Sequence, residues 1–109
     1  MTVVYKVLGQ SNPASSTLTT LYTVPSLTST VISTVAVCNQ AATASTFSIT
    51  VQPAGAALLA KHYLNYNTPL PANDTITLTI GITLAATDII SVYAGSSTLS
   101  FSAFGSEIS

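Results

Sequence analysis

The chain has 109 residues, of which 48% are hydrophobic and only 5% are charged, and its formal net charge is −1. Two lysines without any arginine cannot form the basic patch that binds phosphates, so we expect no nucleic-acid partner. No apolar run approaches the roughly 20 residues of a membrane-spanning helix, and the first ten residues lack the pattern of a secretory signal. We therefore expect one domain with no membrane partner, long enough to bury about two-thirds of its unfolded surface.

Eight segments rich in β-branched and aromatic residues alternate with turn residues, and each is predicted to be a strand. In chain order they are residues 3–8, 18–24, 28–39, 46–51, 62–66, 74–82, 88–94 and 99–104. Residues 54–61 differ, because their composition suits either a short helix or an apolar loop. The spacing predicts an all-β fold: a single antiparallel β-sandwich of about eight strands, jelly-roll or immunoglobulin-like.

The N-terminal residues allow two interpretations. Residues 1–16 combine a short apolar run with a polar loop that contains Pro13. They can form an N-terminal arm or the first strand, because residues 17–109 are predicted to make a β-sandwich domain by themselves.

The longest β-rich segment, residues 28–39, carries apolar side chains on both of its faces. Strict alternation places Val31, Val35 and Val37 on one face and Ile32, Ala36 and Cys38 on the other. Such a pattern is typical of a central or doubly covered strand.

Residues 74–82 give the clearest period-two signal in the chain, because threonines alternate with isoleucine and leucine. We expect the sandwich to be organised around this strand, with Leu78 at its centre and a bend or bulge at Gly81. Across the predicted strands, the inward-facing residues are Phe47, Ile49, Val51, Ile76, Leu78, Ile80, Val92 and Phe101.

The residues that could support catalysis are few and form no recognisable motif. His62 is expected to be exposed or at an interface, and Cys38 to be a small buried hydrophobe. Asp74 and Asp88 each precede a strand, where carboxylates commonly accept hydrogen bonds from turn amides. We therefore predict that the protein is not an enzyme, and we assign no catalytic, metal-binding or cofactor-binding residue.

The scarcity of charge also bears on assembly. Surfaces covered by serine, threonine, asparagine and glutamine do not repel one another, and a net charge near zero promotes association. We expect a homo-oligomer, specifically a trimer.

Five phrases of the sequence carry a family resemblance: LYTVPS, ISTVAVCNQ, FSITVQPAGAAL, PANDTITLTIGITLAATDIISVYA and LSFSAFGSEI. Together they resemble small β-sandwich virion structural proteins of tailed bacteriophages, notably those that infect cyanobacteria. These phrases describe strands and turns and carry no catalytic signature. The resemblance implies a domain that coats or extends a virion.

The resemblance leads to a specific expectation of function. The leading hypothesis is a capsid decoration (cement) protein on the capsid surface of a virion assembled in the host cytoplasm, where it binds the major capsid protein and stabilises the shell. The N-terminal arm or an edge strand is the expected docking element. The alternatives are a tail, baseplate or fibre component, and a carbohydrate-binding adhesin. The absence of tryptophan weakens the adhesin hypothesis, although five tyrosines could line a sugar site.

Overall fold

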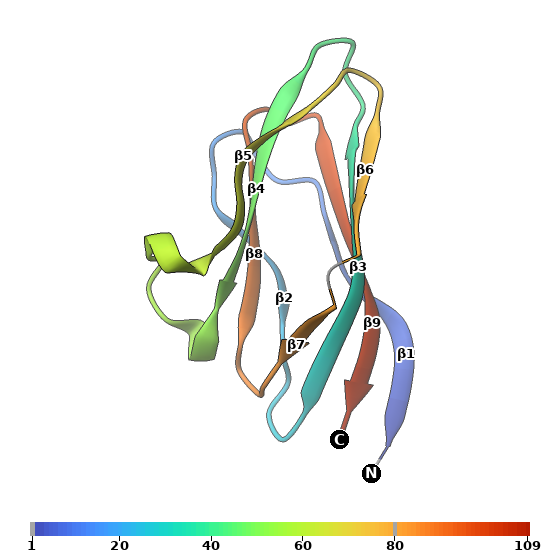
Figure 1. The fold of residues 1–109 in the computed structure, drawn as a ribbon, viewed down its shortest axis with the longest axis vertical. Helices are drawn as coiled ribbons and strands as arrows, with labels where there is room; N and C mark the ends of the chain where they lie inside the picture. The colour runs from blue at the N-terminus through green and yellow to red at the C-terminus, as the bar shows by residue number, and fades with distance from the viewer. Residues whose placement is uncertain (1, 80) are drawn as a thin grey trace.

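The computed structural model describes residues 2–79 and 81–109, which form two antiparallel sheets packed face to face (Figure 1). Its strands are β1 (Val3–Ser11), β2 (Thr19–Thr23), β3 (Ser29–Asn39), β4 (Ser45–Gln52), β5 (Tyr63–Leu70), β6 (Thr75–Leu78), β7 (Ile82–Leu84), β8 (Ile89–Ala94) and β9 (Leu99–Ile108). Between β4 and β5 the chain makes two 3₁₀ turns, η1 (Pro53–Gly55) and η2 (Ala60–His62), joined by a loop. The all-β sandwich predicted from the sequence is confirmed.

The strand order distinguishes the two topologies that the sequence left open. One sheet runs β1-β9-β3-β6, with β7 also paired to β3, and the other runs β2-β8-β4-β5. Since β6 and β7 pair with successive parts of β3, they act as one interrupted strand. The first strand then pairs with the last, the second with the second-last, and so on inward to β4 with β5. This nested pairing is the jelly-roll topology.

The core lies between the two sheets. Phe47 of β4 and Phe101 of β9 come from opposite sheets, are both 0% exposed, and meet edge to face with ring centroids 6.2 Å apart. Such aromatic pairs contribute about 0.5–1.5 kcal/mol beyond the burial of their area. Of the residues predicted to face inward, Ile49 and Val92 are also fully buried, and Val51 is half-buried against the core.

A bulge in β3 changes which residues face the core. The pairing of β3 with β9 shifts register between Ile32 and Thr34. As a result Ile32 lies in the core together with Val35 and Val37, and Val31 lies on the outer face. The strict alternation predicted for this strand was therefore wrong at its start. Gly105 of β9 permits the bulge, because a Cβ there would lie 2.0 Å from the carbonyl oxygen of Val31.

The strand expected at the centre of the fold is an edge strand. β6 spans only Thr75–Leu78, and Ile76 and Leu78 are half-buried against the core rather than enclosed by it. Gly81, with φ of +61°, lies in the predicted bend before β7, whereas Ile80 lies outside the described residues. The regular polar and apolar alternation arose from a strand with one solvated face. The centre of each sheet is formed by β9 and β3, and by β8 and β4.

The N-terminal residues form a strand of the sandwich rather than a free arm. β1 pairs antiparallel with β9 from Val3 to Ser11, and Leu8 belongs to the buried core. After the strand, the side chain of Asn12 donates to the carbonyl oxygen of Leu99 at 2.6 Å. These contacts make residues 3–12 an integral part of one sheet.

Candidate interaction surface

The residues that were weighed for chemistry have structural roles. His62 is buried, and its Nδ1 accepts a hydrogen bond at 3.0 Å from the backbone N–H of Leu59, which closes the η2 turn. The prediction of an exposed or interface histidine was therefore wrong. Asp88 behaves as predicted: its two carboxylate oxygens accept from the backbone N–H groups of Ala54 and Ala85, at 2.8 and 2.9 Å.

The other two residues weighed for chemistry, Cys38 and Asp74, also have ordinary structural positions. Cys38 is half-buried on the outer face of β3 rather than fully buried as expected, and Asp74 accepts from the neighbouring N–H of Thr75. Within residues 2–79 and 81–109, no three His, Cys, Asp or Glu side chains are grouped as metal ligands would be. In the same residues no helix has the length and hydropathy to cross a membrane.

The most distinctive surface is the outer face of the β1-β9-β3 sheet, which exposes large apolar side chains. Tyr5 is 83% exposed, and Val7 and Phe104 lie opposite each other in the β1–β9 register. Val31 of β3 pairs with Ser106, which also pairs with Tyr5. We call Tyr5, Val7, Val31 and Phe104 the β1 patch. They line a shallow hollow of about 540 Å³ on this face.

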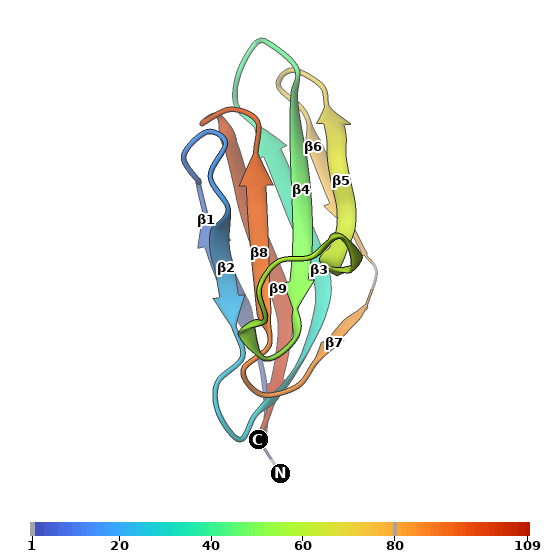
Figure 2. The same cartoon turned by 90° about the vertical axis from the view of Figure 1, so that its left-hand side faces the viewer.

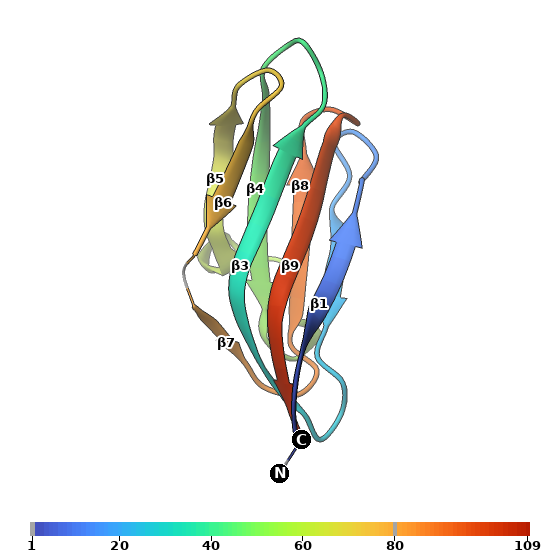
Figure 3. The same cartoon turned by 90° about the vertical axis from the view of Figure 1, so that its right-hand side faces the viewer.

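The patch borders the free edge of the sheet. Figure 3 shows β1 at the end of the sheet, with β9 as its only neighbour in that sheet. Proteins usually protect such an edge with proline, charged side chains or bulges. β1 has no proline and a single charge, Lys6, and its bulge falls between Val7 and Gly9. The backbone N–H and C=O groups of its first half that point away from β9 are therefore free to pair with another strand.

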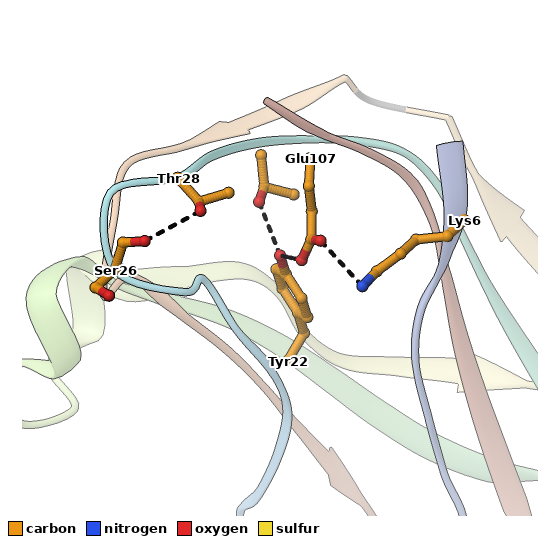
Figure 4. Close-up of polar contacts among 6 residues, drawn as sticks. Lys6, Tyr22, Ser26, Thr28 and Glu107 are labelled. Atoms are coloured by element: carbon orange, nitrogen blue, oxygen red, sulfur yellow. Dashed lines mark hydrogen bonds and ion pairs between the residues drawn. The ribbon is translucent and has the colours of Figure 1, made fainter. Parts of the chain in front are cut away.

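A polar network next to this edge neutralises the charge of Lys6 (Figure 4). Lys6 Nζ lies 2.9 Å from Glu107 Oε1, and the hydroxyl of Tyr22 donates to Glu107 Oε2 at 2.5 Å. The same hydroxyl lies 2.8 Å from Oγ1 of Thr30, which donates to it because the phenol proton is used on Glu107. The network connects β1, β2, β3 and β9, and so joins the two sheets near the chain termini.

The network also shifts two pKa values. Burial, together with the hydrogen bond to Glu107, raises the pKa of Tyr22 to about 12. The hydrogen bonds from Tyr22 and Lys6 lower the pKa of Glu107 below its ordinary value. At neutral pH the site therefore holds a neutral phenol, a carboxylate and an ammonium group. Sequence reasoning missed this network because Tyr22 and Glu107 are 85 positions apart and belong to no motif.

Comparisons with known proteins give a likeness of fold. No protein-family model and no curated protein sequence match the chain. A chain in the solved structure described as "Structure of infectious bursal disease virus Gx strain" superposes with a TM-score of 0.52 and 13% sequence identity. The match covers 97% of this chain but 30% of that chain, so this chain spans less than a third of the viral chain's length.

At this level of identity the likeness shows the fold alone. The β-sandwich is thus one that also occurs in a chain of a virus structure, which agrees with the coarser part of the family resemblance. Membership of the tailed-bacteriophage family stays a prediction.

Proposed function

We propose that this chain is a virion structural protein, specifically a capsid decoration protein that binds the outer surface of the shell. The observation that carries the proposal is the unprotected edge of β1 beside the exposed apolar β1 patch. The fold likeness to a chain of a virus structure supports a structural role in a virion by analogy. The partner would be the major capsid protein.

Docking would proceed by strand addition. An extended segment of the capsid protein would pair with the free backbone groups of residues 3–7, and these hydrogen bonds would supply affinity independent of side chains. Tyr5, Val7 and Phe104 would then be covered, and burial of apolar area contributes roughly 25 cal/mol per Å². Because a shell repeats the same site many times, a modest contact per copy is enough to stabilise the lattice.

The neutral character of the edge fits a site that must meet another surface without repulsion. Lys6 is the one charged residue of β1, and its ammonium group is already paired with Glu107. A homotrimer would offer three such edges to the shell, one from each subunit. Once one edge has bound, the other two edges are held near their own sites on the shell at a high effective concentration.

The alternative position is the tail, baseplate or a fibre. Copy number separates the two proposals: gel densitometry of purified particles should give hundreds of copies per particle for a decoration protein. A few to dozens of copies would place the protein in the tail and overturn the capsid assignment.

The docking surface has its own test. We expect Tyr5→Lys to reduce particle occupancy strongly, because it places a charge in the β1 patch. A matched control is Leu27→Lys, which alters an apolar residue 93% exposed in the turn between β2 and β3, away from the patch. Equal occupancy for both variants would exclude the β1 patch as the docking surface.

A further inference from the structure

Three of the five tyrosines gather on the outer face of the other sheet, away from β1. Tyr93 of β8 lies opposite Ser48 of β4, and Tyr63 of β5 lies opposite Thr50 of β4. Figure 2 faces this sheet and shows β8, β4 and β5 side by side. A cavity of about 270 Å³ lies here, and we call it the tyrosine cavity. Its lining residues are Ser48, Tyr63, Tyr66, Asn67 and Tyr93.

Two of the rings form a corner of the cavity. Tyr63 and Tyr66 pack edge to face, with centroids 4.9 Å apart and planes at 89°. Tyr66 remains 66% exposed, so much of its ring is open to a ligand. The same two tyrosines also line a neighbouring hollow of about 490 Å³, whose other walls are Leu58, Leu59 and Ala60. A ligand in the tyrosine cavity can therefore extend along an apolar wall.

The cavity offers unused hydrogen-bonding groups. Ser48 is only 1% exposed and its Oγ accepts from the backbone N–H of Asn67 at 2.9 Å, so it forms the floor of the cavity and fixes the backbone of Asn67. Among the described residues, the three phenol hydroxyls and the side-chain amide of Asn67 make no hydrogen bond to another protein group, whereas the backbone N–H of Asn67 donates to Ser48. Asn67 has a φ of +46°, a conformation that asparagine tolerates, at the point where the β4–β5 register shifts. None of the five lining residues carries a charge at neutral pH.

We propose that the tyrosine cavity binds a neutral saccharide, either one sugar ring or the end of an oligosaccharide. A sugar ring has an apolar C–H face that can stack on Tyr63 or Tyr66, and a rim of hydroxyls that both donate and accept. The absence of charge disfavours phosphorylated ligands, acidic sugars and cations. The volume lies just below the roughly 300–1,000 Å³ of typical small-molecule sites, which limits the enclosed part to about one ring.

A proline-rich peptide is the competing ligand, because such peptides also dock in aromatic-lined grooves. A proline-rich peptide offers carbonyl oxygens that can accept from the phenol hydroxyls, but its prolines have no N–H donor. The side-chain amide oxygen of Asn67, which needs a donor, would therefore be covered without a partner. Leaving buried polar groups unpaired is costly, and this favours the sugar. The proposal is independent of the capsid assignment, since it concerns the opposite sheet.

Saturation-transfer difference NMR on the full chain tests the proposal, with glucose, galactose, mannose and N-acetylglucosamine as probes. Glucuronic acid and a proline-rich decapeptide serve as competitors of different chemistry. We expect at least one neutral sugar to bind at millimolar concentration. Tyr66→Ala should weaken its Kd about tenfold, the loss of about 1.4 kcal/mol of stacking. Leu27→Ala, which truncates a 93% exposed side chain in the turn between β2 and β3, should leave the Kd unchanged.

Further variants separate the contribution of the tyrosine ring to sugar affinity from that of the hydroxyl. Tyr66→Phe should retain most of the affinity if stacking dominates, whereas Tyr93→Phe should weaken binding by removing a phenol hydroxyl that can pair with the sugar. The exposed position of Tyr66 means that its variants keep the fold, which circular dichroism verifies. The proposal is overturned if none of the four neutral sugars binds, if only glucuronic acid or the peptide binds, or if sugar binding survives Tyr66→Ala unchanged.

Discussion

The hydroxyl of Tyr22 donates a 2.5 Å hydrogen bond to the carboxylate of Glu107, which connects the second strand of the chain to the last. Since Lys6 pairs with the other oxygen of the same carboxylate, one side chain holds strands from both sheets. Glu107 is only 16% exposed, so water competes weakly for these bonds. This arrangement gives the sandwich a pH-dependent contribution to its stability.

At acid pH we expect stability to fall through the titration of Glu107. Its folded-state pKa lies below the unfolded value of 4.5, so its contribution is fully present above that value and is lost as the pH falls through the lower, folded pKa. Urea unfolding followed at a series of pH values measures this effect. Glu107→Gln should flatten the acid dependence, and a variant with an unchanged profile would contradict the assignment.

At alkaline pH we expect stability to fall as the pH rises, through the titration of Tyr22. The pKa of Tyr22 is raised from 10.0 to about 12, so its contribution is present below pH 10 and is lost as the pH rises from 10 to 12. Tyr22→Phe removes the titrating group and the bond to the carboxylate. We expect it to cost about 1–2 kcal/mol at neutral pH and to abolish the alkaline loss. Tyr66→Phe, on the exposed side of the other sheet, is the matched control and should change neither.

Two substitutions, one inside the core and one at its edge, should lower the free energy of unfolding by different amounts. Phe47→Ala should cost about 3–5 kcal/mol, because the ring is fully buried against Phe101. Leu78→Ala should cost only about 1 kcal/mol, because Leu78 lies half-buried on the edge strand β6. Chemical denaturation of both variants gives the comparison, and equal losses would mean that β6 is more central than the structure shows.

Much of the fold could be predicted from period-two patterns, because most strands place a row of apolar side chains toward the core. The patterns gave the wrong inward-facing residues where a tertiary contact shifts the alternation of a strand, as at the bulge of β3 opposite Gly105. They also misplaced the centre of the sandwich. Central strands such as β4 bury small polar residues on their second face, including Ser48 and Thr50, and so alternate less visibly than an edge strand.

The candidate surfaces were harder to predict than the fold. An edge strand was among the expected docking elements, but nothing local in the sequence indicates that Tyr5 and Phe104 share an exposed face. The three tyrosines of the cavity lie on two strands that are separated by β4, so their proximity depends on the sheet order. His62 was misjudged because a ring nitrogen that accepts a backbone N–H leaves no pattern in the sequence.

The bulge in β3 can be tested through Gly105. A Cβ at this position would also lie 3.0 Å from the Cα of Ile32, so both contacts are with backbone and neither neighbour can rotate away. We expect Gly105→Ala to lower stability by about 2 kcal/mol or more. Ser106→Ala, at the next position of β9, should change it by less than about 0.5 kcal/mol. Thermal unfolding of the two variants measures the difference, and a stable Gly105→Ala protein would exclude the tight approach.

Deleting residues 1–10 tests whether the N-terminal strand is part of the domain. The deletion removes most of β1 and the buried side chain of Leu8, and it exposes the edge of β9. We expect the truncated protein to unfold or aggregate, as judged by circular dichroism and size-exclusion chromatography. A folded, monodisperse product would show that β1 is dispensable and would return it to the role of an arm.

The scarcity of charge leads to the last prediction, which concerns association of the protein in isolation. Only five residues of the chain carry a charge at neutral pH, and Lys6 and Glu107 neutralise each other. The repulsion that keeps most small domains apart is therefore nearly absent, and a surface of this kind promotes association. We expect multi-angle light scattering to report a homo-oligomer, with a trimer as the specific prediction. A wild-type protein that stays monomeric at micromolar concentration would contradict self-association in solution.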